Sequence, residues 1–143
     1  MVDDVVLNKA AVIEHCVARV REEYAGDPQR LRDDITRQDS IILNLQRACE
    51  AAIDLAMHVV RVRRLGVPQE TRQSFEMLRD ANLLESRLAD RMMRMVGFRN
   101  VAVHDYRKLD IDVVERIVTD HLDEFLAFAS ALVRSSGAPK TPR

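Results

Sequence analysis

The chain has 143 residues, of which 47% are hydrophobic and 31% are charged, a balance that is typical of one folded domain and excludes a disordered chain. Its formal net charge of −1 excludes a protein that binds nucleic acid through an overall positive charge. Gly and Pro number only four each, so we expect few turns and long elements, which indicates helices.

A first helix is predicted to begin at Asp3 or Asp4, either of which can cap it. Gly26 and Pro28 mark its end, because neither residue readily continues a helix. Its apolar residues recur at steps of three and four, which is the helical period: Val6, Ala10, Ile13, Val17, Val20 and Tyr24.

A second helical pattern extends from Leu31 to Val59, and Gln38 is the one polar residue on its apolar face. Asp39 and Ser40, which follow Gln38, could cap a fresh start. The spacing therefore allows either one long helix or a short helix followed by a long one.

Two further helices are expected in the middle of the chain. A short one covers about residues 71–80, where the helical period continues. Asn82 with Glu85 resembles a capping box at the start of the next helix. We expect Gly97 and Phe98 to interrupt or bend that helix.

Asp110 can cap a last helix, and the polar, Pro-containing stretch after it is expected to be disordered. This gives a domain at residues 1–134 and a tail at residues 135–143. No stretch shows the alternation of a strand. The predicted fold class is all-α, an up-and-down bundle of about five helices.

Cys16 and Cys49 lie far apart on apolar helical faces and are interpreted as small core residues. Together with His15 and His58 they lack the spacing of a zinc site, so we expect no metal and no cofactor. The aspartates near the N-terminus argue against a signal peptide. No run approaches the roughly 18 apolar residues of a membrane span, so a cytoplasmic protein without membrane contact is expected.

Positive charge is concentrated in one segment. Between Arg87 and Lys108 there are six basic and two acidic residues, a local charge of +4. Such a patch can hold an anion although the whole molecule is not positive. A solvated helix face would give the same pattern, so charge alone leaves both interpretations open.

The stretch from Phe98 to Tyr106 gathers side chains that could act on a phosphodiester. His104 can accept or donate a proton near neutral pH, and Arg99 is a permanent forked donor for phosphate oxygens. Asn100 adds a neutral donor and Tyr106 a phenolic hydroxyl. Without a metal, such a set could cleave RNA through its own 2′-hydroxyl, with His104 moving a proton and Arg99 stabilising charge on the phosphorus.

The spacing of these residues constrains how they could meet. Arg99 and His104 are five residues apart, which places them about 140° apart around one straight helix. They therefore cannot converge on one phosphate from a single regular helix. Either the helix breaks here, or two copies supply the groups across a symmetric dimer, where two arginines and two histidines would surround one cleft.

These residues carry a resemblance to a known family. Arg99-Asn100, three further residues and then His104 resemble the signature of the HEPN family, and Tyr106 extends it to the motif of the narrower HepT-like group. The upstream segment 43–56 and the downstream segment 122–125 are also similar. The resemblance covers roughly residues 5–132.

The resemblance implies an all-α, dimeric, metal-independent endoribonuclease that acts as the toxin of a type VII-like HEPN/MNT toxin–antitoxin pair. It implies that Arg99 and His104 of both protomers are catalytic, with Asn100 in the supporting polar position. The implied partner is an MntA-like minimal nucleotidyltransferase that adenylylates Tyr106, which would also contact RNA. The added phosphate charge beside the catalytic pair would inactivate the toxin.

Other interpretations remain open. Arg99 and His104 could hold a phosphate in a non-catalytic nucleotide- or substrate-binding module that works with a nucleotidyltransferase, or the motif could serve packing in a structural dimer. Asp54, His58 and Arg61 share one helical face and could either support the cleft or form a surface salt-bridge stripe.

Overall fold

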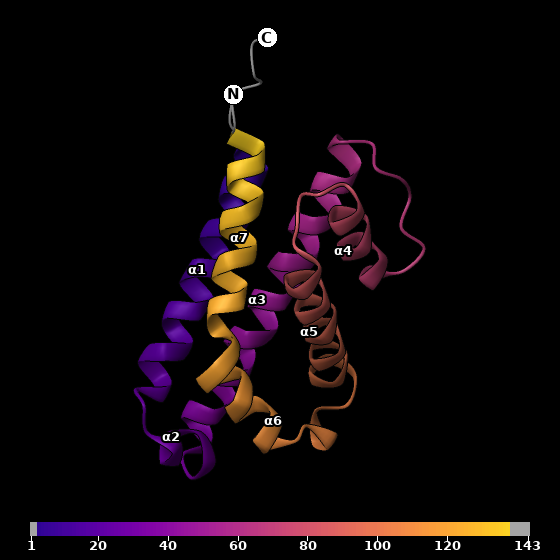
Figure 1. Cartoon of the computed structure of the whole chain (residues 1–143). Coiled ribbons are helices and arrows are strands. Elements are labelled where there is room, and N and C mark those ends of the chain that lie inside the picture. The colour runs from indigo at the N-terminus through magenta and orange to yellow at the C-terminus, as the bar shows by residue number, and fades with distance from the viewer. Residues whose placement is uncertain (1–2, 138–143) are drawn as a thin grey trace.

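Four long helices run up and down along one axis, as the sequence predicts (Figure 1). The structure is a computed structural model that describes residues 3–137, and within this range it contains no strand. The long helices are α1 (Asp4–Tyr24), α3 (Ile35–Val62), α5 (Ser86–His104) and α7 (Leu122–Gly137). Short helices lie between them: α2 (Pro28–Arg32), α4 (Thr71–Asp80) and α6 (Ile111–Arg116).

Helix α3 is central, because it packs against α1, α2, α4, α5 and α7. The aromatic rings of Phe75 on α4 and Phe128 on α7 pack in the core with centroids 5.5 Å apart. Cys16 and Cys49 are free and buried, as expected for small core residues. Burial raises the pKa of both thiols, so neither is an activated nucleophile.

Several helix boundaries follow the sequence. The Asp3 carboxylate accepts hydrogen bonds from the backbone N–H groups of Val5 and Val6, so Asp3 caps α1. Ala25 adopts a left-handed conformation directly after α1, and Gly26 follows it with φ +70°. The expected helix at residues 71–80 is α4, with the predicted bounds.

The open question between residues 31 and 59 is resolved as a short helix followed by a long one. The fresh start lies at Asp34, whose carboxylate accepts from the Arg37 N–H, and not at residues 39–40. A polar residue is tolerated at position 38 on the apolar face, because the side-chain amide of Gln38 donates a hydrogen bond to the Leu31 carbonyl at 2.9 Å. The same side chain therefore ties α3 to the end of α2.

The expected capping box at Asn82 is wrong. Asn82 has φ +62° and ends α4 instead, since its N–H donates to the Arg79 carbonyl and the Leu83 N–H donates to the Leu78 carbonyl. Asparagine tolerates this left-handed conformation, which is common one residue past a helix. Helix α5 begins four residues later with no side-chain cap.

The expected interruption at Gly97 and Phe98 is also wrong, because α5 continues through both residues to His104. A different constraint accounts for the glycine. A Cβ atom at position 97 would lie 3.1 Å from Nη2 of Arg72, whose Nε donates to the Met93 carbonyl. The absence of a side chain at Gly97 lets this arginine cross the helix.

Asp110 is a helix cap as predicted, but the helix that it caps is the short α6: its carboxylate accepts from the Asp112 N–H. A π-helical turn, η2 (Ile117–His121), separates α6 from α7. Helix α7 continues to Gly137, so the end of regular structure lies beyond the expected boundary at residue 134. Residues 138–143 of the expected tail lie outside the described residues.

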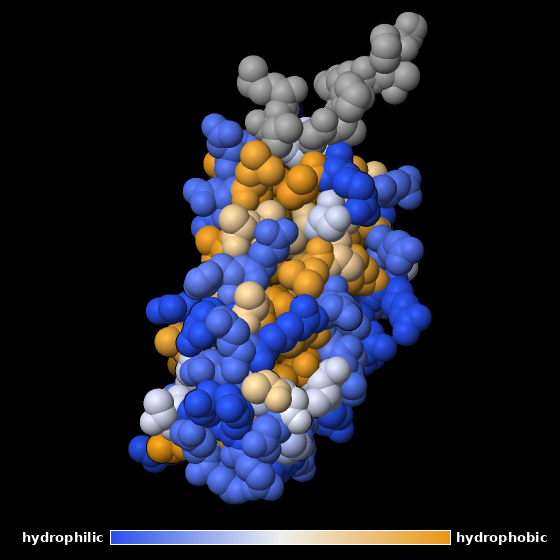
Figure 2. Space-filling view, turned by 90° about the vertical axis from the view of Figure 1, so that its left-hand side faces the viewer, coloured by the Kyte–Doolittle hydropathy of each residue, from blue (hydrophilic) through white to orange (hydrophobic). Residues whose placement is uncertain are grey.

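The surface on the α1 side carries a strip of apolar side chains along its length, whereas the end that holds α2 is hydrophilic (Figure 2). Val5, Leu7 and Val12 of α1 are among the exposed large hydrophobic residues. Even so, no helix within residues 3–137 has the length and apolar character that crossing a membrane requires.

Candidate active site

The motif residues lie at the C-terminal end of α5 and directly after it. Arg99, Asn100 and His104 occupy the last two turns of the helix. Asp105 ends the helix, and Tyr106 begins a short 3₁₀ turn, η1 (Tyr106–Lys108). The chain thus changes direction between the histidine and the tyrosine, so the tyrosine turns back toward α3.

Arg99 is held by an acidic partner on α3. Its Nε and Nη2 atoms both lie against Oε1 of Glu50, at 2.9 and 2.8 Å. Its Nη1 donates to the side-chain oxygen of Asn100 at 2.9 Å. The arginine is three-quarters buried, so its charge is both positioned and partly neutralised.

Tyr106 is held by a second acidic residue of α3. Its hydroxyl donates to Oδ1 of Asp39 at 2.9 Å, while 45% of the residue remains exposed. Partial burial, followed by the hydrogen bond and the negative charge of Asp39, raises the pKa of Tyr106 to about 12. The phenol is therefore neutral at physiological pH and accessible from solvent.

His104 is exposed at the end of α5, and its imidazole has no hydrogen-bond partner among the described residues. The neighbouring Asp105 does not orient it, because this carboxylate pairs with Lys108 at 3.3 Å. A free imidazole on the surface can meet a substrate proton without first breaking an internal contact.

Arg99 and His104 do not converge within one chain. Helix α5 is continuous between them, so their side chains leave the helix about 140° apart. Of the two possibilities that the spacing left open, a break in the helix is therefore excluded. A phosphate that contacts both residue types would need a second copy of the chain.

Two exposed apolar residues lie close to these side chains in sequence. Leu43 on α3, between Asp39 and Glu50, and Val103 on α5, beside His104, are each 42% exposed. Apolar side chains exposed next to a functional motif are typical of a surface that another protein covers.

Asp54, His58 and Arg61 do not support this site. Arg61 donates to Nδ1 of His58 at 3.2 Å, which leaves Nε2 to donate to the Asp3 carboxylate at 2.6 Å. This bond lowers the pKa of Asp3. Asp54 pairs with Lys9 of α1 at 3.1 Å. These contacts therefore hold α1 against the C-terminal half of α3, where His58 lies about 12 Å along the helix from Glu50.

Sequence reasoning missed the two carboxylates that organise the site. Glu50 and Asp39 lie on α3, far in sequence from Arg99 and Tyr106, and nothing in their spacing links them to the motif. One signal was available, since a largely buried arginine needs an acidic partner. Which carboxylate serves depends on how α3 packs against α5, which the sequence pattern does not encode.

Comparison with known proteins gives consistent matches over most of the chain. The family described as "Ribonuclease HepT-like" matches residues 13–132. The mRNA nuclease HepT of Shewanella oneidensis is 45% identical over 130 residues, which are 91% of this chain and 97% of that protein.

Solved structures agree with the sequence matches. The tri-AMPylated HEPN toxin of Shewanella oneidensis in complex with MNT antitoxin superposes with a TM-score of 0.86 at 45% identity, covering 91% of this chain and 97% of that chain. A cytosolic protein of unknown function from Bacillus subtilis, YutE, has a TM-score of 0.81 at 15% identity and covers 98% of this chain and 96% of that one. The second match concerns the fold alone.

Proposed function

The chain belongs to the HepT-like ribonuclease family, and from this membership we propose that it is the ribonuclease toxin of a toxin–antitoxin pair. The observation that carries the proposal is the 45% identity to an mRNA nuclease over nearly the whole length of the chain. The motif residues support it, since Arg99 and His104 lie in the last two turns of α5 and Tyr106 follows directly after it. Its action on RNA would take place in the cytoplasm.

The proposed reaction needs no metal ion. The 2′-hydroxyl of the RNA attacks the adjacent phosphorus, the bond from phosphorus to the 5′ oxygen breaks, and a 2′,3′-cyclic phosphate forms. His104 accepts the proton of the 2′-hydroxyl and then donates it to the leaving 5′ oxygen, so one histidine and one arginine serve each phosphate. Arg99 stabilises the charge that develops on the phosphoryl oxygens, with Asn100 holding one of its nitrogens.

A homodimer forms the proposed active unit. The separation of Arg99 and His104 on one continuous helix supports this assembly, because a second chain can bring the missing group to the same phosphate. The exposed Leu43 and Val103 supply apolar area for such an interface.

The proposed partner is a minimal nucleotidyltransferase of the MntA type, and Tyr106 is the proposed acceptor of AMP. The related toxin is described as tri-AMPylated and in complex with MNT antitoxin. This chain has two tyrosines. Tyr106 is 45% exposed whereas Tyr24 is 8% exposed, so access by another enzyme favours Tyr106. An adenylyl group there adds negative charge and bulk beside His104.

The proposal is tested by incubating the purified, unmodified protein with labelled RNA in EDTA, beside Arg99→Ala and His104→Ala variants. Arg87→Ala serves as a matched control, since this exposed arginine lies on the same helix outside the motif. We expect the parent and the control to cleave and to leave a 2′,3′-cyclic phosphate, while the two motif variants lose at least about 100-fold in rate.

The alternative function makes a different prediction in the same assay. If protein with verified unmodified Tyr106 does not cleave RNA, the chain is a nucleotide- or substrate-binding module that works with the nucleotidyltransferase.

The modification is tested separately, by mass spectrometry after incubation with the partner and ATP. Added mass on Tyr106, absent in a Tyr106→Phe variant, is expected, and added mass on another residue would overturn this assignment.

A further inference from the structure

A groove between α5 and the α6–η2 segment plays no part in the site described above. Its volume is about 530 Å³, within the range of about 300–1,000 Å³ that is typical of small-molecule pockets. Its walls are largely apolar: Met95, Phe98, Val101, Leu109, Val113 and Ile117. Basic side chains surround this apolar floor: Arg91, Arg94, Lys108 and Arg116.

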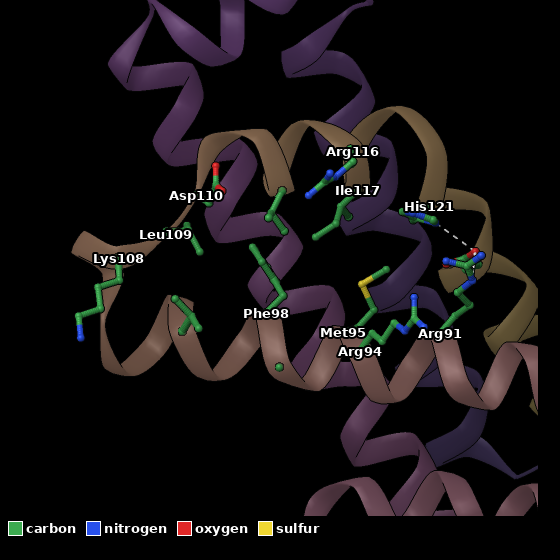
Figure 3. A pocket seen from close by; sticks show the side chains of 14 residues that line it. Arg91, Arg94, Met95, Phe98, Lys108, Leu109, Asp110, Arg116, Ile117 and His121 are labelled. Atoms are coloured by element: carbon green, nitrogen blue, oxygen red, sulfur yellow. Dashed lines mark hydrogen bonds and ion pairs between the residues drawn. The ribbon is translucent and has the colours of Figure 1, made fainter.

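The two central arginines face each other across the groove. Arg94 and Phe98 project from α5 toward α6, and Arg116 projects from α6 toward them (Figure 3). Neither arginine forms an ion pair among the described residues, in contrast to Arg91, which pairs with Glu124. Two guanidinium groups without an acidic partner are free to bind an anion.

The groove adjoins the proposed catalytic histidine. Gly97 and Val101 line it, and His104 follows them at steps of four and three residues, so the three lie on one ridge of α5. Lys108, at one end of the groove, lies just past His104 and Tyr106. An RNA strand bound at His104 can therefore continue directly into the groove.

The other end of the groove is polar. Oε2 of Glu124 lies 3.1 Å from Nδ1 of His121 and 3.6 Å from Nε of Arg91. Oε1 of the same carboxylate is buried and has no hydrogen-bond partner among the described residues. A ligand with N–H groups would supply the missing donor once this carboxylate turns toward it.

We propose that this groove is a nucleotide subsite for the RNA substrate, which binds one unstacked base next to the scissile phosphate. The base lies on the apolar floor formed around Phe98, its flanking phosphate binds Arg94 and Arg116, and its edge is directed toward Glu124. Proteins that select sites in single-stranded RNA hold splayed bases in this way. The inference rests on the proposed ribonuclease function and names where its substrate binds outside the Arg99 and His104 cleft.

The test measures RNA binding separately from cleavage. In a His104→Ala background, the affinity for a fluorescein-labelled, single-stranded RNA of about 12 nucleotides is measured by fluorescence anisotropy. Arg94→Ala combined with Arg116→Ala removes the phosphate contacts, and Val113→Trp fills the groove without changing charge. Arg87→Ala combined with Arg134→Ala, two exposed arginines outside the groove, is the control for lost charge.

We expect both groove variants to bind RNA about tenfold more weakly or worse, and the control to stay within about twofold. The Glu124→Gln variant, made with an intact His104, is expected to shift the bases at which RNA is cut. All variants are checked for unchanged unfolding midpoints and dimer elution.

Equal affinity of the groove variants and the control would overturn the inference, and continued RNA cleavage by the parent would leave the proposed function standing. Absence of cleavage by the parent, with groove-dependent RNA binding retained, would refute the ribonuclease function and leave the groove as an RNA-binding site. A loss of dimer on filling the groove, with RNA affinity retained, would make it an interface between copies and overturn the inference too.

Discussion

In the isolated chain, the guanidinium of Arg99 is already occupied, since Nε and Nη2 both donate to Oε1 of Glu50. A phosphate that approaches Arg99 also meets the negative charge of this carboxylate. Glu50 therefore has two opposing effects on catalysis. It holds the arginine in one orientation, and it weakens the attraction of the site for RNA.

A Glu50→Gln variant separates these effects, because glutamine keeps the acceptor oxygen and loses the charge. We expect KM for RNA to fall about threefold to tenfold, with kcat nearly unchanged and a loss of unfolding free energy below about 1 kcal/mol, as for other partly exposed ion pairs. Steady-state cleavage kinetics and urea unfolding measure these quantities. A raised KM together with a lower kcat would mean that the charge of Glu50 is needed to position Arg99.

The hydrogen bond between Tyr106 and Asp39 makes a prediction about titration. Burial raises the pKa of the phenol first, and Asp39 raises it further by accepting the proton and by its negative charge. An Asp39→Asn variant removes the charge, so the pKa of Tyr106 should fall from about 12 toward the ordinary value of 10 without reaching it. Phenolate formation then begins at lower pH.

The measurement is an ultraviolet absorbance titration in a Tyr24→Phe background, which leaves Tyr106 as the one tyrosine. Asp33→Asn is the matched control, because this exposed carboxylate makes no contact with the phenol. An unchanged titration of Tyr106 in the Asp39 variant would show that burial alone sets its pKa.

At the scale of elements, the continuity of α5 through Gly97 decides how the motif is displayed. Glycine in a helix interior costs about 1 kcal/mol relative to alanine. The Cβ of an alanine would lie 3.1 Å from Nη2 of Arg72, which is the far end of a flexible, exposed side chain. We therefore expect Gly97→Ala to raise the free energy of unfolding by about 0.5–1 kcal/mol in urea unfolding, after a small shift of Arg72.

A double-mutant cycle with Arg72→Ala supplies the control. In the Arg72→Ala background, Gly97→Ala should stabilise at least as much, since the crowding atom is gone. Destabilisation by Gly97→Ala in the parent, relieved in the Arg72→Ala background, would show that this arginine cannot move and that the glycine is required.

The sequence predicted those elements whose signals are local. Asp3 and Asp110 cap helices because a carboxylate needs only the next N–H groups, which lie two or three residues away. The predictions for Asn82 and Gly97 were wrong because asparagine can begin or end a helix, and glycine can interrupt a helix or make room for a neighbouring side chain. The packing of α4 beside α5 determines which role each residue has. The π turn before α7 has no comparable local signal in the sequence.

The same distinction holds for the site. The motif was predicted because its residues lie within eight positions of one another, and their placement at the end of α5 follows the helical period. Glu50 and Asp39 could not be predicted, because the contacts that bring α3 to Arg99 and Tyr106 are tertiary. The sequence thus indicated the reactive groups and not the carboxylates that hold them.

At the scale of the whole molecule, the angle between Arg99 and His104 makes a single chain an incomplete enzyme under the proposed mechanism. In a symmetric dimer, the arginine of one protomer can face the histidine of the other. An Arg99→Ala chain and a His104→Ala chain each lack one group, yet a mixed dimer of the two retains one arginine and one histidine on different chains.

We therefore expect activity to reappear when the two inactive variants are mixed and allowed to exchange subunits. Random exchange places about half of the chains in mixed dimers. Each mixed dimer has one pair of Arg99 and His104 on different chains, whereas the parent dimer has two, so RNA cleavage should reach about a quarter of the parent's rate. The Arg99→Ala, His104→Ala double variant mixed with either single variant is the control and should stay inactive, because no mixed dimer then contains both groups. If the mixture of single variants also stays inactive although subunit exchange is verified by native mass spectrometry, Arg99 and His104 act within one chain. In that case the side chains must rotate around the end of α5 to reach a common phosphate, and a dimer is not required for the chemistry.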